Sequence, residues 1–175
     1  MPPRRPRKPR TPRTPRRPRA PRDRTGAGGS GSPGVTGSGG AGARSGFAPA
    51  LRRVTGPADT NHQGTVFGGV ILSLIDQAGY IEARRHGLHR WVTVTIDRVV
   101  FTAPVFPGDV VQLSTRTLAT GRSSVTVDVL VEAERYRSGE VVTVTEAQLK
   151  MVAVGADGRS IDFRAPPTSG EVPGA

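Results

Sequence analysis

A polar turn that leads into an apolar stretch with one carboxylate is the part of this sequence best suited to chemistry. Residues 61–79 read NHQGTVFGGVILSLIDQAG. Gly68 and Gly69 stand where a helix would begin, and the first N–H groups of a helix lack partners within it, so they can hold a carbonyl oxygen. Asp76 follows Gly69 by about two turns, a rise of roughly 10 Å, and projects from the same side. The pattern predicts a helix start and a carboxylate that act on one carbonyl group.

The same residues also have a plain structural interpretation. Paired glycines often only allow the chain to turn tightly into a helix, and an aspartate in an apolar run can cap a loop or face water. Asn61 and Thr65 precede the helix and are either polar helpers in catalysis or the caps of a turn. The spacing alone leaves these alternatives open.

The net charge of the chain, +11 over 175 residues, is confined to its beginning. Residues 1–24 hold 11 basic residues and one acid, which gives +10, and Arg44 adds +1. Residues 51–175 balance 13 basic against 13 acidic residues. The basic composition therefore gives no reason to expect that the body of the chain binds nucleic acid.

Residues 1–46 are predicted to form a disordered arm. Proline recurs at every third position from 3 to 21, the period of polyproline II, and a Gly/Ser-rich linker follows. Three interpretations of the arm stay open. The first is a solvated extension, translated from upstream sequence because the true start of the protein lies further on. The second is an electrostatic arm for nucleic acid or another polyanion, and the third is a ligand of a polyproline-binding domain. A secretory signal is not expected, because no apolar segment follows the basic residues.

Composition narrows the class of protein further. The sequence has no cysteine, which excludes a disulfide or a thiol nucleophile and favours a cytoplasmic location. No apolar run approaches the roughly 18 residues of a membrane span. The three histidines, His62, His86 and His89, lack acidic neighbours at ligand spacing and are expected on the surface. We therefore expect neither a metal nor a cofactor.

The body, residues 47–165, is predicted to be one α+β domain followed by a flexible tail, 166–175. Its helix is expected from Phe67 to about Arg85 and, being apolar on most sides, should be enclosed by other structure. Alternating Val- and Thr-rich segments indicate antiparallel strands with one buried face. The strands are expected near 51–54, 91–101, 110–119, 123–136 and 141–154.

This order of elements, an antiparallel sheet wrapped around one long central helix, resembles the hotdog fold. Within it, NHQGTVFGGVILSLIDQAG, FTAPVFPGDVV, GRSS and MVAVGADGR are similar to motifs of the hotdog acyl-CoA thioesterases. The resemblance covers residues 57–159 and none of the arm. It implies an enzyme that hydrolyses acyl-CoA to a free fatty acid and coenzyme A, with the length of the acyl chain left open.

The resemblance also implies roles for individual residues. The N–H groups around Gly68 and Gly69 would stabilise the oxyanion, and Asp76 would be the general base or a nucleophile. Relatives often carry Asn or Asp where this chain has Thr65. The coenzyme A arm and phosphates would lie along the turn made of Gly121, Arg122, Ser123 and Ser124. This turn could instead be a plain hairpin with a solvated arginine.

A homo-oligomer is a further implication of the resemblance, namely a dimer with shared sites that assembles into a trimer of dimers. The alternative function is a non-catalytic acyl-CoA-binding hotdog sensor that contacts nucleic acid through its basic arm. Sensors of that kind carry a helix-turn-helix, and residues 1–46 show no apolar period from which to build one. A dehydratase would need a histidine in the site, and the predicted helix has none.

Overall fold

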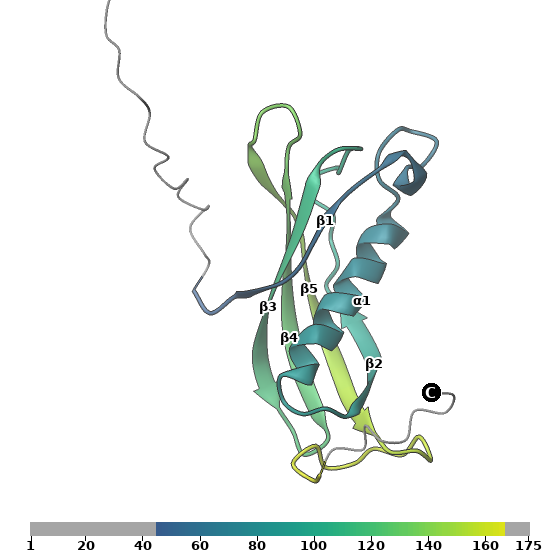
Figure 1. The fold of residues 1–175 in the computed structure, drawn as a ribbon, viewed down its shortest axis with the longest axis vertical. Helices are drawn as coiled ribbons and strands as arrows, with labels where there is room; N and C mark the ends of the chain where they lie inside the picture. The colour runs from purple at the N-terminus through teal and green to yellow at the C-terminus, as the bar shows by residue number, and fades with distance from the viewer. Residues whose placement is uncertain (1–44, 167–175) are drawn as a thin grey trace, which may run out of the picture. The chain divides into compact units, whose positions relative to one another are not determined.

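The computed structural model describes residues 45–166, which form one antiparallel sheet and one long helix (Figure 1). The strands are β1 (Ala48–Val54), β2 (Arg90–Asp97), β3 (Val110–Thr120), β4 (Ser124–Glu134) and β5 (Val141–Val154). Helix α1 spans Gly68–Arg84, and a short 3-10 helix, η1 (Pro57–Asp59), precedes it. Apart from residues 45, 46 and 166, the predicted arm and tail lie outside the described residues.

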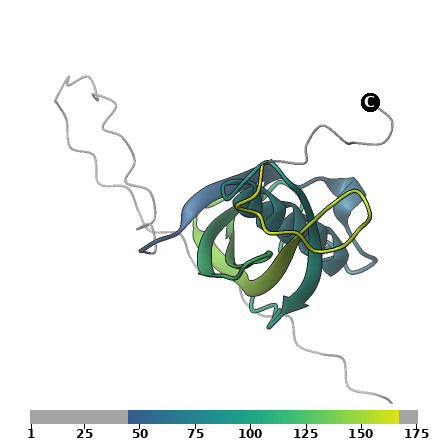
Figure 2. The same cartoon turned by 90° about the horizontal axis from the view of Figure 1, so that it is seen from below.

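The strands are ordered β1-β3-β4-β5-β2, and every neighbouring pair is antiparallel. The sheet curves around α1, as the view from below shows (Figure 2). Alternation fixes which face is buried, because successive side chains of a strand point to opposite faces. In β4, Val125, Val127 and Val129 lie in the core, while Thr126 and Asp128 are only half-buried. The predicted fold is confirmed.

Helix α1 packs one face against the concave side of the sheet. Ile71, Ile75 and Ala78 recur at helical spacing and are fully buried there. At Gly79 the helix approaches β5 closely, since a Cβ atom added at this position would lie 2.8 Å from Leu149 Cδ2. The glycine therefore sets the depth at which the helix lies on the sheet.

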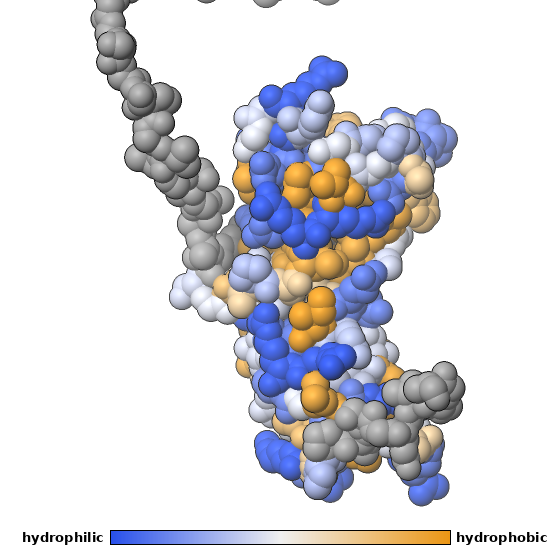
Figure 3. Space-filling view, viewed as in Figure 1, coloured by the Kyte–Doolittle hydropathy of each residue, from blue (hydrophilic) through white to orange (hydrophobic). Residues whose placement is uncertain are grey.

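The outer face of α1 is exposed within one chain. Leu72 and Tyr80 are 36% and 39% exposed, and apolar patches lie between polar side chains on this side of the molecule (Figure 3). The prediction of a helix enclosed on most sides thus holds only for the side that faces the sheet. An apolar outer face on a helix leaves surface that a partner molecule could cover.

Strand β2 ends at Asp97, four residues before the predicted end at Phe101, and this prediction was wrong. Arg98 adopts a positive φ of 61°, which a non-glycine residue rarely does, and turns the chain out of the sheet. The chain then runs beside β5, where the N–H of Thr102 donates to the carbonyl oxygen of Val144 at 2.8 Å. Residues 98–109 consequently form a wall near the start of α1.

The prediction of surface histidines was wrong for His89, which is 5% exposed. Its Nε2 lies 2.7 Å from the carbonyl oxygen of Phe163, and its ring meets Trp91 edge to face. This burial could not be predicted from the local sequence, because Phe163 comes from a segment 74 residues further along the chain. Among the described residues, no helix is long and apolar enough to cross a membrane.

Candidate active site

The turn before α1 is held by Asn61 and Thr65. Asn61 Oδ1 accepts hydrogen bonds from the N–H groups of Gln63 and Thr65, at 2.9 Å and 3.3 Å, and its Nδ2 donates to Thr65 Oγ1 at 2.9 Å. The Asn61 N–H donates to the Thr65 carbonyl oxygen at 2.8 Å. Both side chains thus build the turn itself, as the structural interpretation predicts. Their part in catalysis stays a prediction.

The first turn of α1 has no side-chain cap. Phe67 is the N-cap residue, in an extended conformation, and cannot accept a hydrogen bond through its ring. A Cβ atom at Gly69 would lie 2.7 Å from that ring, and one at Gly68 would lie 3.5 Å from the ring of Phe101. The two glycines therefore give the aromatic rings room while leaving the N–H groups of the helix start without a side-chain acceptor.

Asp59 of η1 fixes the chain just ahead of this turn. Its carboxylate accepts hydrogen bonds from the N–H of Gly56 at 2.8 Å and from Arg53 at 2.6 Å, and its carbonyl oxygen accepts one from the N–H of Phe67 at 2.8 Å. The hydrogen bond from Gly56, together with Arg53, lowers the pKa of Asp59 below its ordinary value. The resulting stabilisation is present above the unfolded pKa, near 4, and is lost as the pH falls below it.

Asp76 lies on the exposed side of α1, in the middle of the helix. Thr93 Oγ1, from β2, donates a hydrogen bond to Asp76 Oδ1 at 2.5 Å and lies 3.1 Å from Met151 Sδ. Thr93 is the one described side chain that hydrogen bonds to this carboxylate, so Oδ2 stays open to solvent or substrate. The sequence analysis did not single out Thr93. A signal was available, because Thr93 follows Trp91 by two positions and therefore lies on the same, inward face of the strand.

A pocket of about 290 Å³ opens beside the helix start. It is lined mainly by apolar side chains, and its lining includes Thr65, Gly68, Ile71, Phe101, Val105 and Val144. The N–H of Val66 donates to the carbonyl oxygen of Val105 at 2.8 Å, which closes one wall. The uncapped helix start and this apolar space therefore share Gly68.

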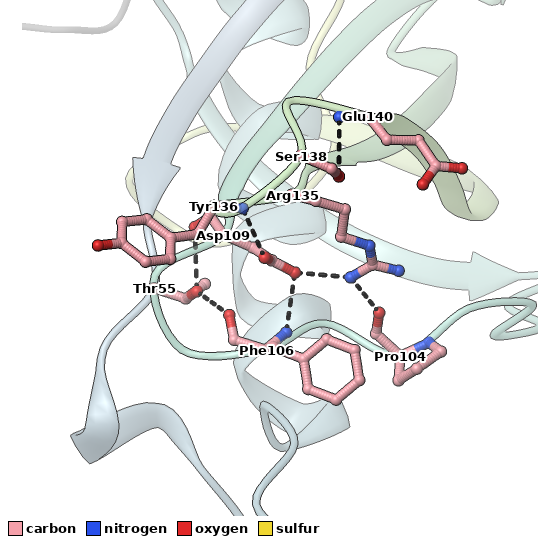
Figure 4. A network of polar contacts seen from close by, with 8 residues as sticks. All are labelled: Thr55, Pro104, Phe106, Asp109, Arg135, Tyr136, Ser138 and Glu140. Carbon is pink, nitrogen blue, oxygen red and sulfur yellow. Dashed lines mark hydrogen bonds and ion pairs between the residues drawn. The ribbon is translucent and has the colours of Figure 1, made fainter. Parts of the chain in front are cut away.

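Asp109 anchors the segment that forms the far wall of the pocket (Figure 4). This carboxylate is 3% exposed and accepts hydrogen bonds from Arg135 at 2.6 Å and from the N–H groups of Phe106 and Tyr136 at 3.0 Å and 3.2 Å. Arg135 also donates to the Pro104 carbonyl oxygen at 2.8 Å. A buried charge with several partners holds its surroundings rigidly, so the wall is fixed to the β4–β5 hairpin.

The turn at 121–124 lies beyond the other end of α1. The N–H of Gly121 donates to the Ser124 carbonyl oxygen at 2.7 Å, and the Arg122 carbonyl oxygen accepts from the N–H of Phe163 at 3.3 Å. Phe163 in turn meets the ring of His86, just past the helix. A helix of 17 residues is about 25 Å long, so one chain does not bring this turn to Gly68. The side chain of Arg122 is exposed, and Ser123 is half-buried.

The residues predicted as a site therefore fall into three places along one helix. These are the turn and uncapped N–H groups at its start, Asp76 at its middle, and the 121–124 turn beyond its end. Between residues 45 and 166, no three acidic or histidine side chains are grouped closely enough to hold a metal ion. The arrangement offers a hydrogen-bond donor site, a carboxylate, an apolar pocket and a distant cation.

A long helix on a curved antiparallel sheet, with a glycine pair at the helix start, defines a hotdog-fold protein. Residues 63–140 match the model of the thioesterase superfamily. The acyl-CoA thioester hydrolase YciA of Escherichia coli is 38% identical over 112 residues, which cover 62% of this chain and 85% of that protein.

Solved structures agree. A hexameric hotdog-fold thioesterase of Campylobacter jejuni has a TM-score of 0.65 and 40% identity, and the match covers 69% of this chain and 92% of that one. A hexameric broad-specificity acyl-coenzyme A thioesterase has a TM-score of 0.64 and 38% identity, over 70% of this chain and 84% of that one. The chain belongs to the acyl-CoA thioester hydrolase family of the thioesterase superfamily.

Proposed function

We propose that this protein hydrolyses acyl-CoA thioesters to a free fatty acid and coenzyme A. The observation that carries the proposal is the Asp76 carboxylate, which Thr93 holds with one oxygen free, in a chain whose long helix also begins without a side-chain cap at Gly68 and Gly69. Membership of the acyl-CoA thioester hydrolase family supports the same reaction. The free oxygen of this carboxylate is available to take a proton from water, a step that hydrolysis requires and binding alone does not.

In the proposed reaction, N–H groups of Gly68 and Gly69 polarise the thioester carbonyl and stabilise the oxyanion. Asp76 acts in one of two ways. As a general base, it takes a proton from a water molecule, whose oxygen attacks the carbonyl carbon. The C–S bond then breaks, and the coenzyme A thiolate takes up the proton. As a nucleophile, Asp76 would displace the thiolate directly to form an anhydride, which water then hydrolyses.

We propose further that each site is completed by a second copy of the chain. The roughly 10 Å rise between Gly69 and Asp76 exceeds what one bridging water can span, about 6 Å from two hydrogen bonds. A carboxylate of one copy near the helix start of another would remove this gap. The open edge at β2, where Val94 is 56% exposed, is the surface we propose for a dimer, with a trimer of dimers as the full assembly. Relatives described as hexameric support this.

The 121–124 turn is the proposed grip on coenzyme A. Arg122 would pair with its phosphates, and Gly121, Ser123 and Ser124 would line the pantetheine arm. Such a ligand would run along the helix or reach the turn of the second copy. Asn61 and Thr65 would then help by holding the turn at the helix start rigid.

For the arm, we propose a weak electrostatic contact with nucleic acid or another polyanion in the cytoplasm. This contact would be independent of catalysis. The support is the charge of +10 over residues 1–24, set against a balanced body. If the sensor function were correct instead, the protein would bind acyl-CoA without turnover. A truncated chain that begins at Gly46 should keep kcat/KM and lose salt-sensitive binding to DNA. Loss of activity on truncation would show that the arm completes the site.

The direct test of the proposed function is the release of coenzyme A from a panel of substrates from acetyl-CoA to palmitoyl-CoA. A thiol reagent suits this assay, because the chain contains no cysteine and only released coenzyme A would react. We expect turnover of at least one substrate by the full chain. Stoichiometric binding of acyl-CoA with no release of thiol would favour the sensor.

A further inference from the structure

The turn proposed to hold coenzyme A is itself held by a segment outside residues 63–140, which match the thioesterase superfamily. We infer that Phe163, held in turn by His86 and His89, is a positioning residue that sets the backbone of Arg122 for its contact with the coenzyme A phosphates. The inference deepens the proposed function and rests on it, because it takes the 121–124 turn as the grip on that ligand.

Residues 155–166, the Phe163 segment, fold back along the end of the sheet after β5. The N–H of Ile161 donates to the carbonyl oxygen of Ala153 at 2.9 Å, and the N–H of Phe163 donates to the carbonyl oxygen of Arg122 at 3.3 Å. The segment, yellow in Figure 1, lies at the same end of the molecule as the last turn of α1. It therefore bridges the proposed grip and the end of the helix.

Backbone hydrogen bonds fix one side of the turn and leave the arginine side chain free. The carbonyl oxygen of Ser123 accepts from the N–H of Ala153 at 2.9 Å, and the carbonyl oxygen of Arg122 has the N–H of Phe163 as its partner. The side chain of Arg122 is exposed, and no residue between 45 and 166 forms an ion pair with its guanidinium. Phe163 thus holds the peptide group from which an unpaired cation projects.

His89 holds Phe163 through the backbone. Its Nε2 lies 2.7 Å from the carbonyl oxygen of Phe163 and, because a carbonyl oxygen only accepts, this nitrogen carries the proton and donates it. The other ring nitrogen, Nδ1, is buried and has no hydrogen-bond partner in the described part of the chain. An apolar side chain would avoid that cost in stability but could not donate to Phe163. The carbonyl oxygen of the segment is therefore held at the expense of a bare buried nitrogen.

His86 holds Phe163 through its ring, and a buried carboxylate outside the proposed chemistry orients this histidine. Glu82 is 6% exposed and accepts hydrogen bonds from Thr115 Oγ1 at 2.8 Å and from Thr117 Oγ1 at 2.9 Å. Since Thr117 donates its one proton to Glu82, it accepts from His86 Nε2 at 2.7 Å. The His86 ring then meets the ring of Phe163 edge to face, with the centroids 6.0 Å apart. Phe163 is thereby linked to both α1 and β3.

These contacts lie within one chain, so they do not depend on how a second copy completes the site. A turn whose backbone is already fixed loses little conformational freedom when a ligand binds, and this raises affinity. If the Phe163 segment were released, Arg122 would project from a looser turn and its ordering would oppose binding. The affinity for the phosphate end of the substrate should therefore depend on Phe163, while the chemistry at Asp76 should not.

Two kinds of substitution loosen the turn. Phe163→Ala removes the ring that contacts His86 and Trp91, and His89→Leu removes the donor to the carbonyl oxygen. His89→Gln keeps an N–H donor near the end of the side chain and should retain the wild-type KM. The control for the loss of buried apolar atoms is Leu113→Ala, at a fully buried position toward the start of β3. Thermal unfolding of each variant shows which proteins are folded at the assay temperature.

The measurement compares two thioesters of the same acid in the full-length protein. One is an acyl-CoA that the wild type hydrolyses, and the other is the N-acetylcysteamine thioester, which ends before the phosphates. Phe163→Ala and His89→Leu should raise the KM for acyl-CoA by about five- to tenfold with kcat within about twofold of wild type, and should leave kcat/KM for the short thioester unchanged. Leu113→Ala should leave the ratio of the two kcat/KM values as in the wild type. Phe163→Ala added to Arg122→Ala should raise KM no further, because both act through one contact.

Three results would overturn the inference while the proposed hydrolysis stands. They are equal losses on both thioesters in the Phe163 and His89 variants, an unchanged KM for acyl-CoA in folded Phe163→Ala beside a raised one in Arg122→Ala, and an unchanged KM in Arg122→Ala itself. If Phe163→Ala does not fold, the His89 pair gives the test, and equal KM values in His89→Leu and His89→Gln would overturn the inference. No release of thiol from any acyl-CoA by the wild type would overturn the proposed function as well.

Discussion

Thr93 Oγ1 donates a hydrogen bond of 2.5 Å to Asp76 Oδ1 and thereby joins the edge strand β2 to the middle of α1. The bond occupies one carboxylate oxygen and orients the other. At this exposed carboxylate water competes for the same oxygen, so the bond acts mainly by favouring one rotamer of the aspartate. Thr93 is therefore a positioning residue for the proposed catalytic group.

Replacement of Thr93 should reduce turnover while leaving substrate binding nearly intact. In Thr93→Val the shape is retained and the donor is lost, so kcat should fall by about 10- to 100-fold with little change in KM. Thr93→Ser keeps the hydroxyl and should recover most of the activity. Steady-state kinetics of both variants would test whether the Thr93 hydroxyl positions Asp76 for catalysis. Equal activity in Thr93→Val and Thr93→Ser would mean that the hydrogen bond is only structural.

Gly79→Ala should destabilise the protein. The added Cβ would lie 2.8 Å from Leu149 Cδ2, so the helix or the leucine has to move, at a cost of about 1–3 kcal/mol. Gln77→Ala, on the exposed side of the same helix, is the matched control and should change stability by less than about 0.5 kcal/mol. Urea unfolding of the three proteins gives the comparison. An unchanged midpoint for Gly79→Ala would contradict this prediction and show that the helix and Leu149 accommodate the added methyl group without cost.

A charge on the open edge of the sheet should dissolve the proposed dimer. Val94 is the most exposed apolar side chain of β2, and Val94→Lys places an unpaired ammonium where a second copy would pack. Light scattering should show a smaller assembly with greatly reduced activity. Tyr136→Lys, at a 75% exposed position of the β4–β5 hairpin, serves as control. A fully active monomer would argue against sites completed by a second copy.

Arg122→Ala should weaken substrate binding rather than chemistry. If the guanidinium pairs with a coenzyme A phosphate, KM should rise by about tenfold with kcat nearly unchanged. Added salt should raise the KM of the wild type more steeply than that of the variant, because the lost pair is screened by ions. Arg159→Ala is the control, as its side chain is 87% exposed and lies in a different turn. Parallel salt dependences would leave Arg122 as a solvated side chain.

Much of the fold could be predicted from the sequence because it depends on local periods. The alternation of valine with polar residues in β4 specifies a strand and its buried face, and Gly68 and Gly69 mark the start of α1. The end of β2 could not be predicted in this way, since the alternation continues past the break. Only the positive φ of Arg98 ends the strand, and arginine has no preference for that conformation.

The residues of the candidate site likewise divide into those that local spacing predicts and those that depend on tertiary packing. Asp76 could be chosen from its spacing to Gly69, which is a property of one helix. Its partner Thr93 depends on how β2 lies beside α1, and the burial of His89 depends on Phe163, which is distant in sequence. Contacts of this kind follow from tertiary packing and leave little trace in the local pattern.

The kcat of Asp76→Asn on a hydrolysed acyl-CoA tests the proposed mechanism most directly. Asparagine preserves the shape of the side chain, so the variant should fold, assemble and bind substrate as the wild type does. Without a carboxylate there is neither a general base nor a nucleophile, and kcat should fall by about 10²- to 10⁴-fold. Wild-type turnover by a folded Asp76→Asn protein would contradict the mechanism and remove Asp76 from the chemistry.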